Sequence, residues 1–360
     1  MLLRLAGRLP DDLLTQARAW LAEETLTKIA EAVVATAVTQ RLTVHPADVE
    51  LLASLLPETG EGRRQVAGLA TSEQDVVPPY VFQPVSPEEA NKIRRRGGTV
   101  PVALDLTTGA PLPLDSVDAA AVEAVAASSG VRGLWRSWRL AADRASWPLP
   151  RRVYLVEVDD PGQRHRLAAD LQGLLAAAGE ATPQVEVTAV GAAAAYYQRT
   201  ARGGGALLWA REAAPAIENV SVFDLVDPVL GATFAPDHPL VTDPSIRAEM
   251  LDYLDNGHPL MFTTATIDDV VDVTRGSVVP LNFRTDGTWL WPEAVTYYLR
   301  EHNLRPDDRL VEHMERAGYQ ISPLDGVAIF RTLTKLQEPP ESEPVWRFHD
   351  DEPDDVESPS

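Results

Sequence analysis

Residues 276–298 read GSVVPLNFRTDGTWLWPEAVTYY and contain the strongest local structural signals of the chain. Asp286-Gly287 predicts the two-residue turn of a β-hairpin, because both central positions of a type I′ turn need φ > 0, which Asp tolerates and Gly adopts freely. Pro292 then begins a helix, since the first helical turn does not need the N–H that proline lacks. The stretch predicts a strand, a turn, a Trp-rich strand and a helix in succession.

This two-residue turn sets the register of the hairpin. The expected pairs are Thr285 with Thr288, Arg284 with Trp289, Phe283 with Leu290, and Asn282 with Trp291. Because successive side chains alternate between the two faces of a strand, Phe283 and Leu290 share the face that we expect in the core. Arg284, Trp289 and Trp291 share the other face. That face is either covered by the following helix or partly open, with Arg284 stacked on Trp289 as an anchor for a partner.

The composition limits the kinds of partner and site. A net charge of −21 over 360 residues makes nucleic acid an unfavourable partner, because an acidic surface repels phosphate. No run reaches the roughly 20 apolar residues of a membrane span, so we expect no membrane association. The absence of cysteine excludes disulfides and thiolate zinc sites and is typical of cytoplasmic proteins. Arginine far outnumbers lysine, which together with the alanine runs is typical of bacterial proteins from GC-rich genomes.

The order of the expected helices and strands predicts an α+β protein of two or three domains. Residues 11–56 have apolar residues at helical spacing, and their apolar face either packs in a bundle or serves self-association. Residues 151–210 follow a β-α-β-α-β pattern. We expect a helical unit at 1–56, a linker at 57–98, an α/β or ferredoxin-like domain at 99–215, an α+β module with the hairpin at 216–337, and a disordered acidic tail at 338–360.

Residues 131–152 interleave tryptophan with arginine. Such a pattern can stack bases and neutralise phosphates, which the acidity of the whole chain disfavours. Leu134, Trp138 and Ala141 lie at helical spacing. We therefore interpret the stretch as a helix that packs on a sheet and exposes its arginines to solvent.

Two glycine-containing stretches predict turns. The three glycines at 203–205 follow a predicted helix and precede a predicted strand. That order is typical of a helix C-terminus, whereas a phosphate-binding loop follows a strand and begins a helix. A second Asp-Gly pair, Asp325-Gly326, predicts a turn before a closing strand at 327–333.

The chain contains none of the sequence motifs of the common catalytic sites, so enzymatic activity is not indicated. Its seven histidines show no metal-ligand spacing, and we expect neither a metal nor a cofactor. His302 and His313 each follow a glutamate on neighbouring predicted helices, where they either meet or lie on the surface. The candidate binding residues belong to the hairpin and the helix after it: Arg284, Asp286, Trp289, Trp291, Tyr297 and Tyr298.

Residues 283–302 read FRTDGTWLWPEAVTYYLREH. The TDGxWxW motif and the Tyr-Tyr-Leu helix after it resemble C-terminal modules of uncharacterised bacterial proteins, some of them associated with toxin–immunity or secretion genes. This resemblance covers the final third of the chain and implies a binding or immunity-like role, with no catalytic residues. We therefore expect a protein that binds another protein, steered electrostatically if that partner is basic. The alternative is an enzyme or small-ligand sensor with a non-standard site between the middle domain and the hairpin module.

Overall fold

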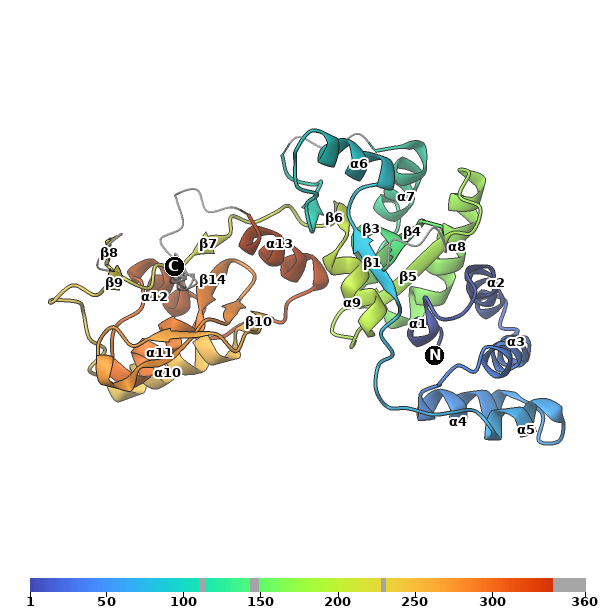
Figure 1. Ribbon diagram of the computed structural model, residues 1–360, viewed down its shortest axis with the longest axis horizontal. Helices are drawn as coiled ribbons and strands as arrows, with labels where there is room; N and C mark the ends of the chain where they lie inside the picture. Colours follow the sequence, from blue (N-terminus) through green and yellow to red (C-terminus); the bar gives the residue numbers. More distant parts are fainter. Residues whose placement is uncertain (110–113, 143–148, 228–230, 339–360) are drawn as a thin grey trace, which may run out of the picture. The chain divides into compact units, whose positions relative to one another are not determined.

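The computed structural model describes residues 1–109, 114–142, 149–227 and 231–338. The fold is α+β, as predicted. The chain divides into two compact units (Figure 1). Unit 1 consists of Met1–Ala216 and Pro323–Thr334, and unit 2 of Ile217–Ser322 and the residues from Lys335 onward. The tail that we expect to be disordered lies outside the described residues, apart from Glu338.

Unit 1 is built on a mixed six-stranded sheet in the order β2-β6-β3-β4-β5, with β1 paired to β3. The predicted β-α-β-α-β order is present as β4-α8-β5-α9-β6. Strand β3 lies between β4 and β6 and is antiparallel to both, whereas β4 and β5 are parallel. The strands are β1 (Tyr80–Gln83), β2 (Leu104–Asp105), β3 (Val131–Ala141), β4 (Arg151–Val158), β5 (Gln184–Ala189) and β6 (Ala206–Ala210).

Helices cover both faces of this sheet. Alternate residues of β4 point to opposite sides: Leu155 faces α1–α5, α9 and α13, whereas Val156 faces α7 and α8. The N-terminal helices therefore share their core with the sheet. The helices of unit 1 are α1 (Leu2–Leu5), α2 (Asp11–Ala22), α3 (Leu26–Thr39), α4 (Pro46–Leu55), α5 (Glu61–Ala67), α6 (Pro87–Arg95), α7 (Ser116–Ala126), α8 (Arg164–Ala177), α9 (Tyr196–Gly203) and α13 (Gly326–Leu336), with a 3₁₀ turn η1 (Pro161–Gln163) before α8.

The prediction of a helix in residues 131–152 is wrong, because β3 is a strand of 11 residues. The helical interpretation places the arginines in solvent. Instead, Arg139 is almost completely buried and donates to Asp11 (2.6 Å), and Arg136 donates to Asp118 (2.6 Å). Carboxylates inside unit 1 thus pair with both arginines. Arginine in this stretch can therefore face the interior of the unit, and the apparent helical spacing of the apolar residues does not indicate a helix. Paired arginines of this kind are also not available to phosphates.

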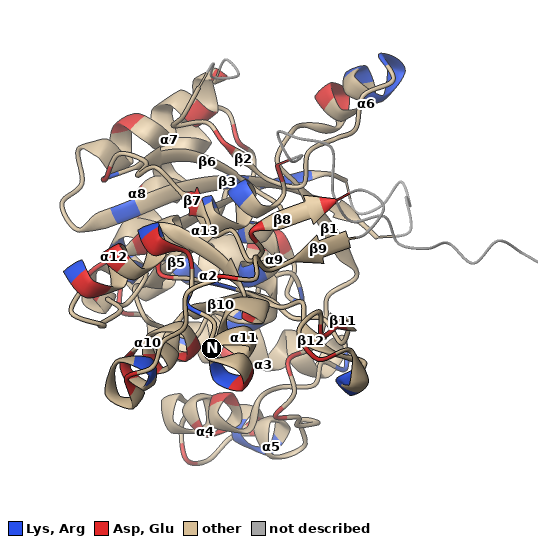
Figure 2. Ribbon diagram, turned by 90° about the vertical axis from the view of Figure 1, so that its left-hand side faces the viewer, with Lys and Arg blue, Asp and Glu red and all other residues tan. Residues whose placement is uncertain are grey.

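The stretch expected as a linker, residues 57–98, contains α5, β1 and α6. Helix α6 has acidic residues in its first turn and Lys92, Arg94 and Arg95 in its last turn, and Figure 2 shows this separation of charge. The arrangement complements the helix dipole, positive at the N-terminus and negative at the C-terminus. The dipole is therefore a structural explanation for this cluster of arginines.

The prediction of a closing strand at 327–333 is also wrong, because these residues belong to helix α13. Asp325 caps the helix by accepting from the backbone N–H of Ala328 (2.9 Å), so the Asp-Gly pair begins a helix rather than a turn. Phe330 is buried in the core of unit 1. Gly326 donates its N–H to Glu157 (2.7 Å), and a Cβ at this position would collide with the Arg202 side chain. Any larger residue at this position would therefore displace the end of the Arg202 side chain.

Unit 2 contains a smaller sheet in the order β10-β13-β14-β7 and the two-stranded pairs β8–β9 and β11–β12. Its strands are β7 (Glu218–Asn219), β8 (Leu225–Asp227), β9 (Gly231–Thr233), β10 (His258–Met261), β11 (Thr266–Asp268), β12 (Ser277–Pro280), β13 (Phe283–Thr285) and β14 (Trp289–Pro292). Its helices are α10 (Pro244–Asn256), α11 (Glu293–His302) and α12 (Asp308–Arg316), with a 3₁₀ turn η2 (Val273–Arg275).

The hairpin β13–β14 forms, but its predicted register is wrong. Arg284 pairs with Trp291 rather than with Trp289, a shift of two residues. Because the shift is an even number of residues, the faces of the strands are unchanged. The observed pairs are Phe283 with Pro292, Arg284 with Trp291, and Thr285 with Leu290.

The side chain of Asp286 explains this register. Its Oδ1 accepts from the backbone N–H groups of Thr288 (2.8 Å) and Trp289 (2.7 Å), and the hydroxyl of Thr285 donates to the Trp289 carbonyl (2.6 Å). Gly287 has a φ of 95°, whereas Asp286 does not have a positive φ. The connection is thus a longer loop organised around a carboxylate, not a type I′ turn.

Candidate functional site

The two tryptophans of the hairpin lie in the core of unit 2. Trp291 is 0% exposed, and its ring stacks on Tyr253 of α10 with centroids 6.0 Å apart. Trp289 lies against His313 of α12 (centroids 5.8 Å), and Arg309 of the same helix lies over its ring at 5.4 Å. The tryptophan face is therefore covered by α10 and α12, to which α11 adds two further core residues.

Arg284 does not stack on Trp289. Its guanidinium donates to Glu293 (2.7 Å) and to the backbone carbonyls of Asp255 (2.9 Å) and Gly257 (3.0 Å). These contacts join the end of α10 to the start of α11. Arg284 therefore has a structural role within unit 2.

Asp286 is the centre of a buried polar cluster. Its Oδ2 accepts from the hydroxyl of Tyr253 (2.5 Å) and lies 2.6 Å from Nε2 of His313. Burial opposes the charged form, but the hydrogen bonds from Tyr253 and from two backbone N–H groups outweigh it, so the pKa of Asp286 is lowered from its ordinary value. The cluster connects the hairpin loop to α10 and α12.

A second cluster of the same composition surrounds Asp269. This completely buried carboxylate accepts from the hydroxyl of Tyr297 (2.9 Å) and lies 2.7 Å from Nε2 of His302. Burial again opposes the charge, and hydrogen bonds from His302 and the following backbone lower the pKa of Asp269. The neighbouring Tyr298 accepts from the N–H of Val270 (3.3 Å). Both tyrosines of the candidate set therefore hold the loop after β11.

These two clusters have the composition of an acid–base site but the contacts of a structural one. His302 and His313 do not contact each other, because each is hydrogen-bonded to a different carboxylate. Both oxygens of each carboxylate are occupied: Oδ1 by backbone N–H groups of its own loop, and Oδ2 by a tyrosine and a histidine on the neighbouring helices. The described residues contain no group of three or more histidine or carboxylate side chains that could hold a metal ion. None of the described helices has the length and apolar character needed to cross a membrane.

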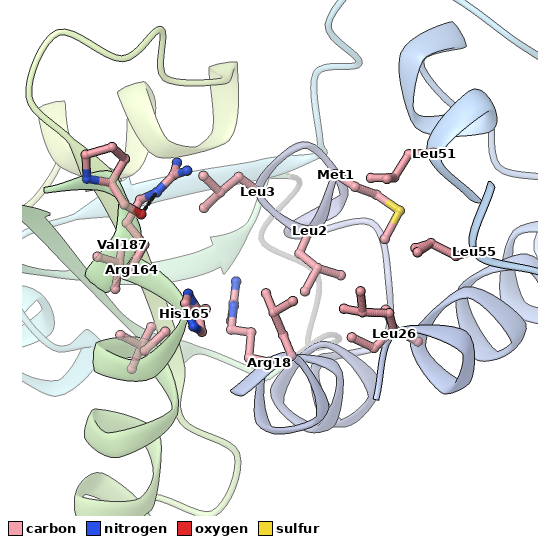
Figure 3. Close-up of a pocket in the computed structure, with 15 residues that line it drawn as sticks. Met1, Leu2, Leu3, Arg18, Leu26, Leu51, Leu55, Arg164, His165 and Val187 are labelled. Atoms are coloured by element: carbon pink, nitrogen blue, oxygen red, sulfur yellow. Dashed lines mark hydrogen bonds between the residues drawn. The ribbon is translucent and has the colours of Figure 1, made fainter. Parts of the chain in front are cut away.

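A cavity of about 380 Å³ lies in unit 1, at the edge strand β5 of the sheet. One wall consists of leucines and Met1 from α1 to α4, and the opposite wall consists of η1, the start of α8 and β5 (Figure 3). The lining residues are Met1, Leu2, Leu3, Arg18, Leu21, Leu26, Ile29, Leu51, Leu55, Pro161, Arg164, His165, Ala168, Val185 and Val187. The lining is therefore mostly apolar, with a small number of polar groups.

The polar groups that line this cavity are all basic: Arg18, Arg164 and His165. None of the acidic residues in the described part of the chain lines it. In Figure 3 the side chain of Arg18 lies between the leucine wall and His165. The cavity thus offers an apolar volume with two arginines and a histidine along one side.

Arg18 is 4% exposed and forms a buried ion pair with Glu186 of β5 (2.5 Å). The other carboxylate oxygen of Glu186 accepts from Gln198 (3.0 Å). The second terminal nitrogen of Arg18, Nη1, has no hydrogen-bond partner among the described residues. A buried donor without a partner is costly, and such groups are uncommon in folded proteins.

Sequence patterns do not identify this cavity, because its lining comes from segments that are far apart in the chain. One signal is nevertheless present in α2. Arg18 follows Leu14 by four residues and precedes Leu21 by three, so it lies on the buried face of an amphipathic helix. A charged residue at such a position indicates a buried partner or a ligand.

No protein-family model, curated protein or solved structure matches this chain. The geometry and chemistry of the two units are therefore the only basis for its function.

Proposed function

We propose that the protein binds a small, largely apolar molecule in the cavity of unit 1. The observation that carries this proposal is the cavity itself, with its apolar lining and its few basic groups. Ligand sites typically have this composition and volumes of roughly 300–1,000 Å³. Such a site makes the protein a ligand-binding protein or sensor, in a cytoplasm as the cysteine-free sequence leads us to expect.

The position of the cavity differs from the site expected between the middle domain and the hairpin module. The N-terminal helices form one side of it, and the apolar residues Leu26 and Leu51 are partly exposed where they line it. Self-association is the other use of these helices that their apolar face suggests. If a ligand binds among the leucines, these residues serve ligand binding rather than self-association.

We expect Leu51→Glu to weaken binding of the neutral fluorescent probe N-phenyl-1-naphthylamine by about tenfold, because it replaces apolar wall with a charge. The matched control is Val38→Glu on α3, since Val38 is 43% and Leu51 42% exposed and only Leu51 lines the cavity. Fluorescence titration of the two variants and the unmodified protein measures the effect. Equal affinities in all three proteins, or no binding by any of them, would contradict the proposal.

A second candidate is binding of another protein through unit 2. Phe262 is 73% exposed and Val273 is 77% exposed, both in the segments around β11. Exposed apolar side chains of this size favour a contact surface where they gather into one patch. The net charge of −21 would steer a basic partner toward the protein, which agrees with the immunity-like role implied by the resemblance of the hairpin.

We expect the double variant Phe262→Ser/Val273→Ser to lose a basic protein that the unmodified chain retains in pull-downs from native lysate. The matched control is Val102→Ser, because Val102 is also exposed (61%) but lies in unit 1. Retention of the same partner by the double variant would exclude this surface. Loss from both variants would indicate a nonspecific apolar contact.

A further inference from the structure

The last turn and the C-cap of helix α6 carry four basic residues, Lys92 and the three consecutive arginines at 94–96, and Figure 2 shows positive charge at this end of the helix. We propose that this α6 basic surface binds the acidic segment 350–357 of the same chain, through ion pairs between guanidinium and carboxylate groups. None of the four residues lines the cavity of unit 1, so the inference does not depend on the proposed function.

The first argument is that the three arginines have no carboxylate partner among the described residues. All three are exposed, and Arg94 donates only to the side-chain amide of Asn91 (3.5 Å). Exposure alone does not explain this, because the side chain of Arg199 is 56% exposed and still lies 3.9 Å from Asp75. The dipole of α6 favours positive charge at this end of the helix, but it uses none of the guanidinium N–H groups. These donors are therefore available to a carboxylate from outside the described residues.

The second argument is the charge of the acidic segment. Residues 350–357 read DDEPDDVE, in which six of the eight residues are acidic and none is basic. No other stretch of eight residues in the sequence has as many acidic residues. A guanidinium group binds a carboxylate with two parallel hydrogen bonds, and such charge-assisted bonds are stronger than neutral ones. The densest negative charge of the chain therefore complements the α6 basic surface.

The third argument is the reach of the chain. Helix α13, which precedes the acidic segment, belongs to unit 1 through Thr334, and α6 belongs to the same unit. From the end of α13 at Leu336, the chain to Asp350 can span about 45 Å. A unit of this size has a radius of gyration of about 17 Å, so its surface lies within that span. The covalent link gives the segment an effective concentration of about 1 mM, at which even a weak attraction is sufficient.

The test is zero-length crosslinking of the full chain with a carbodiimide, which joins a carboxylate to a lysine amine where the two are in contact. The only lysines of the chain are Lys28, Lys92 and Lys335, and Lys92 belongs to the α6 basic surface. At low ionic strength, where screening is weak, we expect mass spectrometry to find residues 350–357 joined to Lys92 about tenfold more often than to Lys28, which is also exposed. Lys335 is the internal control for the reagent, because its Nζ lies 2.7 Å from Glu338.

The triple variant Arg94→Gln/Arg95→Gln/Arg96→Gln should reduce the crosslink from the acidic segment to Lys92 about fivefold, because it removes the attracting charges and keeps the lysine. The yield is measured relative to the local crosslink of Lys92 to Glu89, whose charged atoms lie 3.0 Å apart. This reference corrects for any change in the reactivity of Lys92 itself.

The matched control is Arg41→Gln/Arg63→Gln/Arg64→Gln, which removes the same charge from exposed arginines of the same unit. We expect it to leave the crosslink to Lys92 unchanged. An equal loss in both triple variants would show that only the overall charge of the protein matters, and it would overturn the inference. A melt by circular dichroism confirms that both variants are folded.

Equal crosslinking of Lys92 and Lys28, or an undiminished crosslink to Lys92 in the first triple variant, also overturns the inference. The absence of a crosslink from the acidic segment to Lys92 has the same meaning when Lys335 is joined to Glu338. A mixture of isotope-labelled and unlabelled protein separates contacts within one chain from contacts between two copies. Crosslinks found only between copies contradict binding within the chain.

Discussion

Replacing Trp291 with alanine is expected to destabilise unit 2 by about 3–5 kcal/mol, the range for truncation of a buried aromatic residue. Trp291 is completely buried between β13–β14 and α10, where it stacks on Tyr253. The backbone of Gly257 lies against the indole so closely that a Cβ there would collide with it. Neighbouring groups packed this tightly cannot close the cavity that the missing ring leaves.

Urea unfolding followed by far-UV circular dichroism measures this effect on the transition of unit 2. Phe262→Ala is the control, because it removes another large aromatic side chain of the same unit from a mostly exposed position. We expect it to change stability by about 0.5 kcal/mol or less. If the two variants unfold at the same urea concentration, Trp291 does not contribute to the core as its burial indicates.

Sequence patterns predict the faces of the hairpin correctly and its register incorrectly. Alternation along a strand is a local property, so Arg284 and Trp291 share a face as expected. The register depends on how Asp286 uses its carboxylate. A carboxylate that accepts from two backbone N–H groups in its own loop competes with the type I′ turn, and the Asp-Gly dipeptide does not distinguish these outcomes.

The elements predicted incorrectly are those whose environment comes from distant parts of the chain. The sequence predicts that the arginines of strand β3 are exposed, but the fold places Asp11 and Asp118 where they accept hydrogen bonds from them. Helix α13 packs on the core of unit 1. The strands of the sheet that it covers come more than a hundred residues earlier in the chain. Its apolar residues also suit a strand, because a short apolar run does not by itself separate the two structures.

For the candidate sites, too, the sequence shows local patterns but not the contacts between distant segments. Aromatic and charged residues around a turn are easy to select from sequence. Trp289 and Trp291 are nevertheless buried by α10 and α12, and Tyr298 by Phe223 and Phe234, and the sequence does not reveal this packing. The cavity of unit 1 is formed by α1 to α4, η1, α8 and β5, which no local pattern connects. Only Arg18, a charge on an apolar helix face, indicates it in advance.

Replacing Asp286 with alanine should be as damaging as the loss of Trp291, about 3–5 kcal/mol, because it leaves several buried partners unsatisfied. These partners are the Tyr253 hydroxyl, His313 and the backbone N–H groups of Thr288 and Trp289. Asp286→Asn retains acceptors for some of them and should cost less. Urea unfolding at neutral pH measures the stability of the unmodified protein and of the two variants.

The same carboxylate makes unit 2 sensitive to acid. The pKa of Asp286 is lowered in the folded protein, so its contribution to stability is present above the unfolded value of about 3.9 and is lost as the pH falls from there through the folded pKa. The stability difference between the unmodified protein and Asp286→Asn should therefore shrink between pH 5 and pH 3, chiefly below about pH 4. Asp269 titrates in both proteins, and its contribution cancels in this difference. Urea unfolding across this range measures the difference, and one that stays constant down to pH 3 would show that Asp286 does not stabilise unit 2 through its charge.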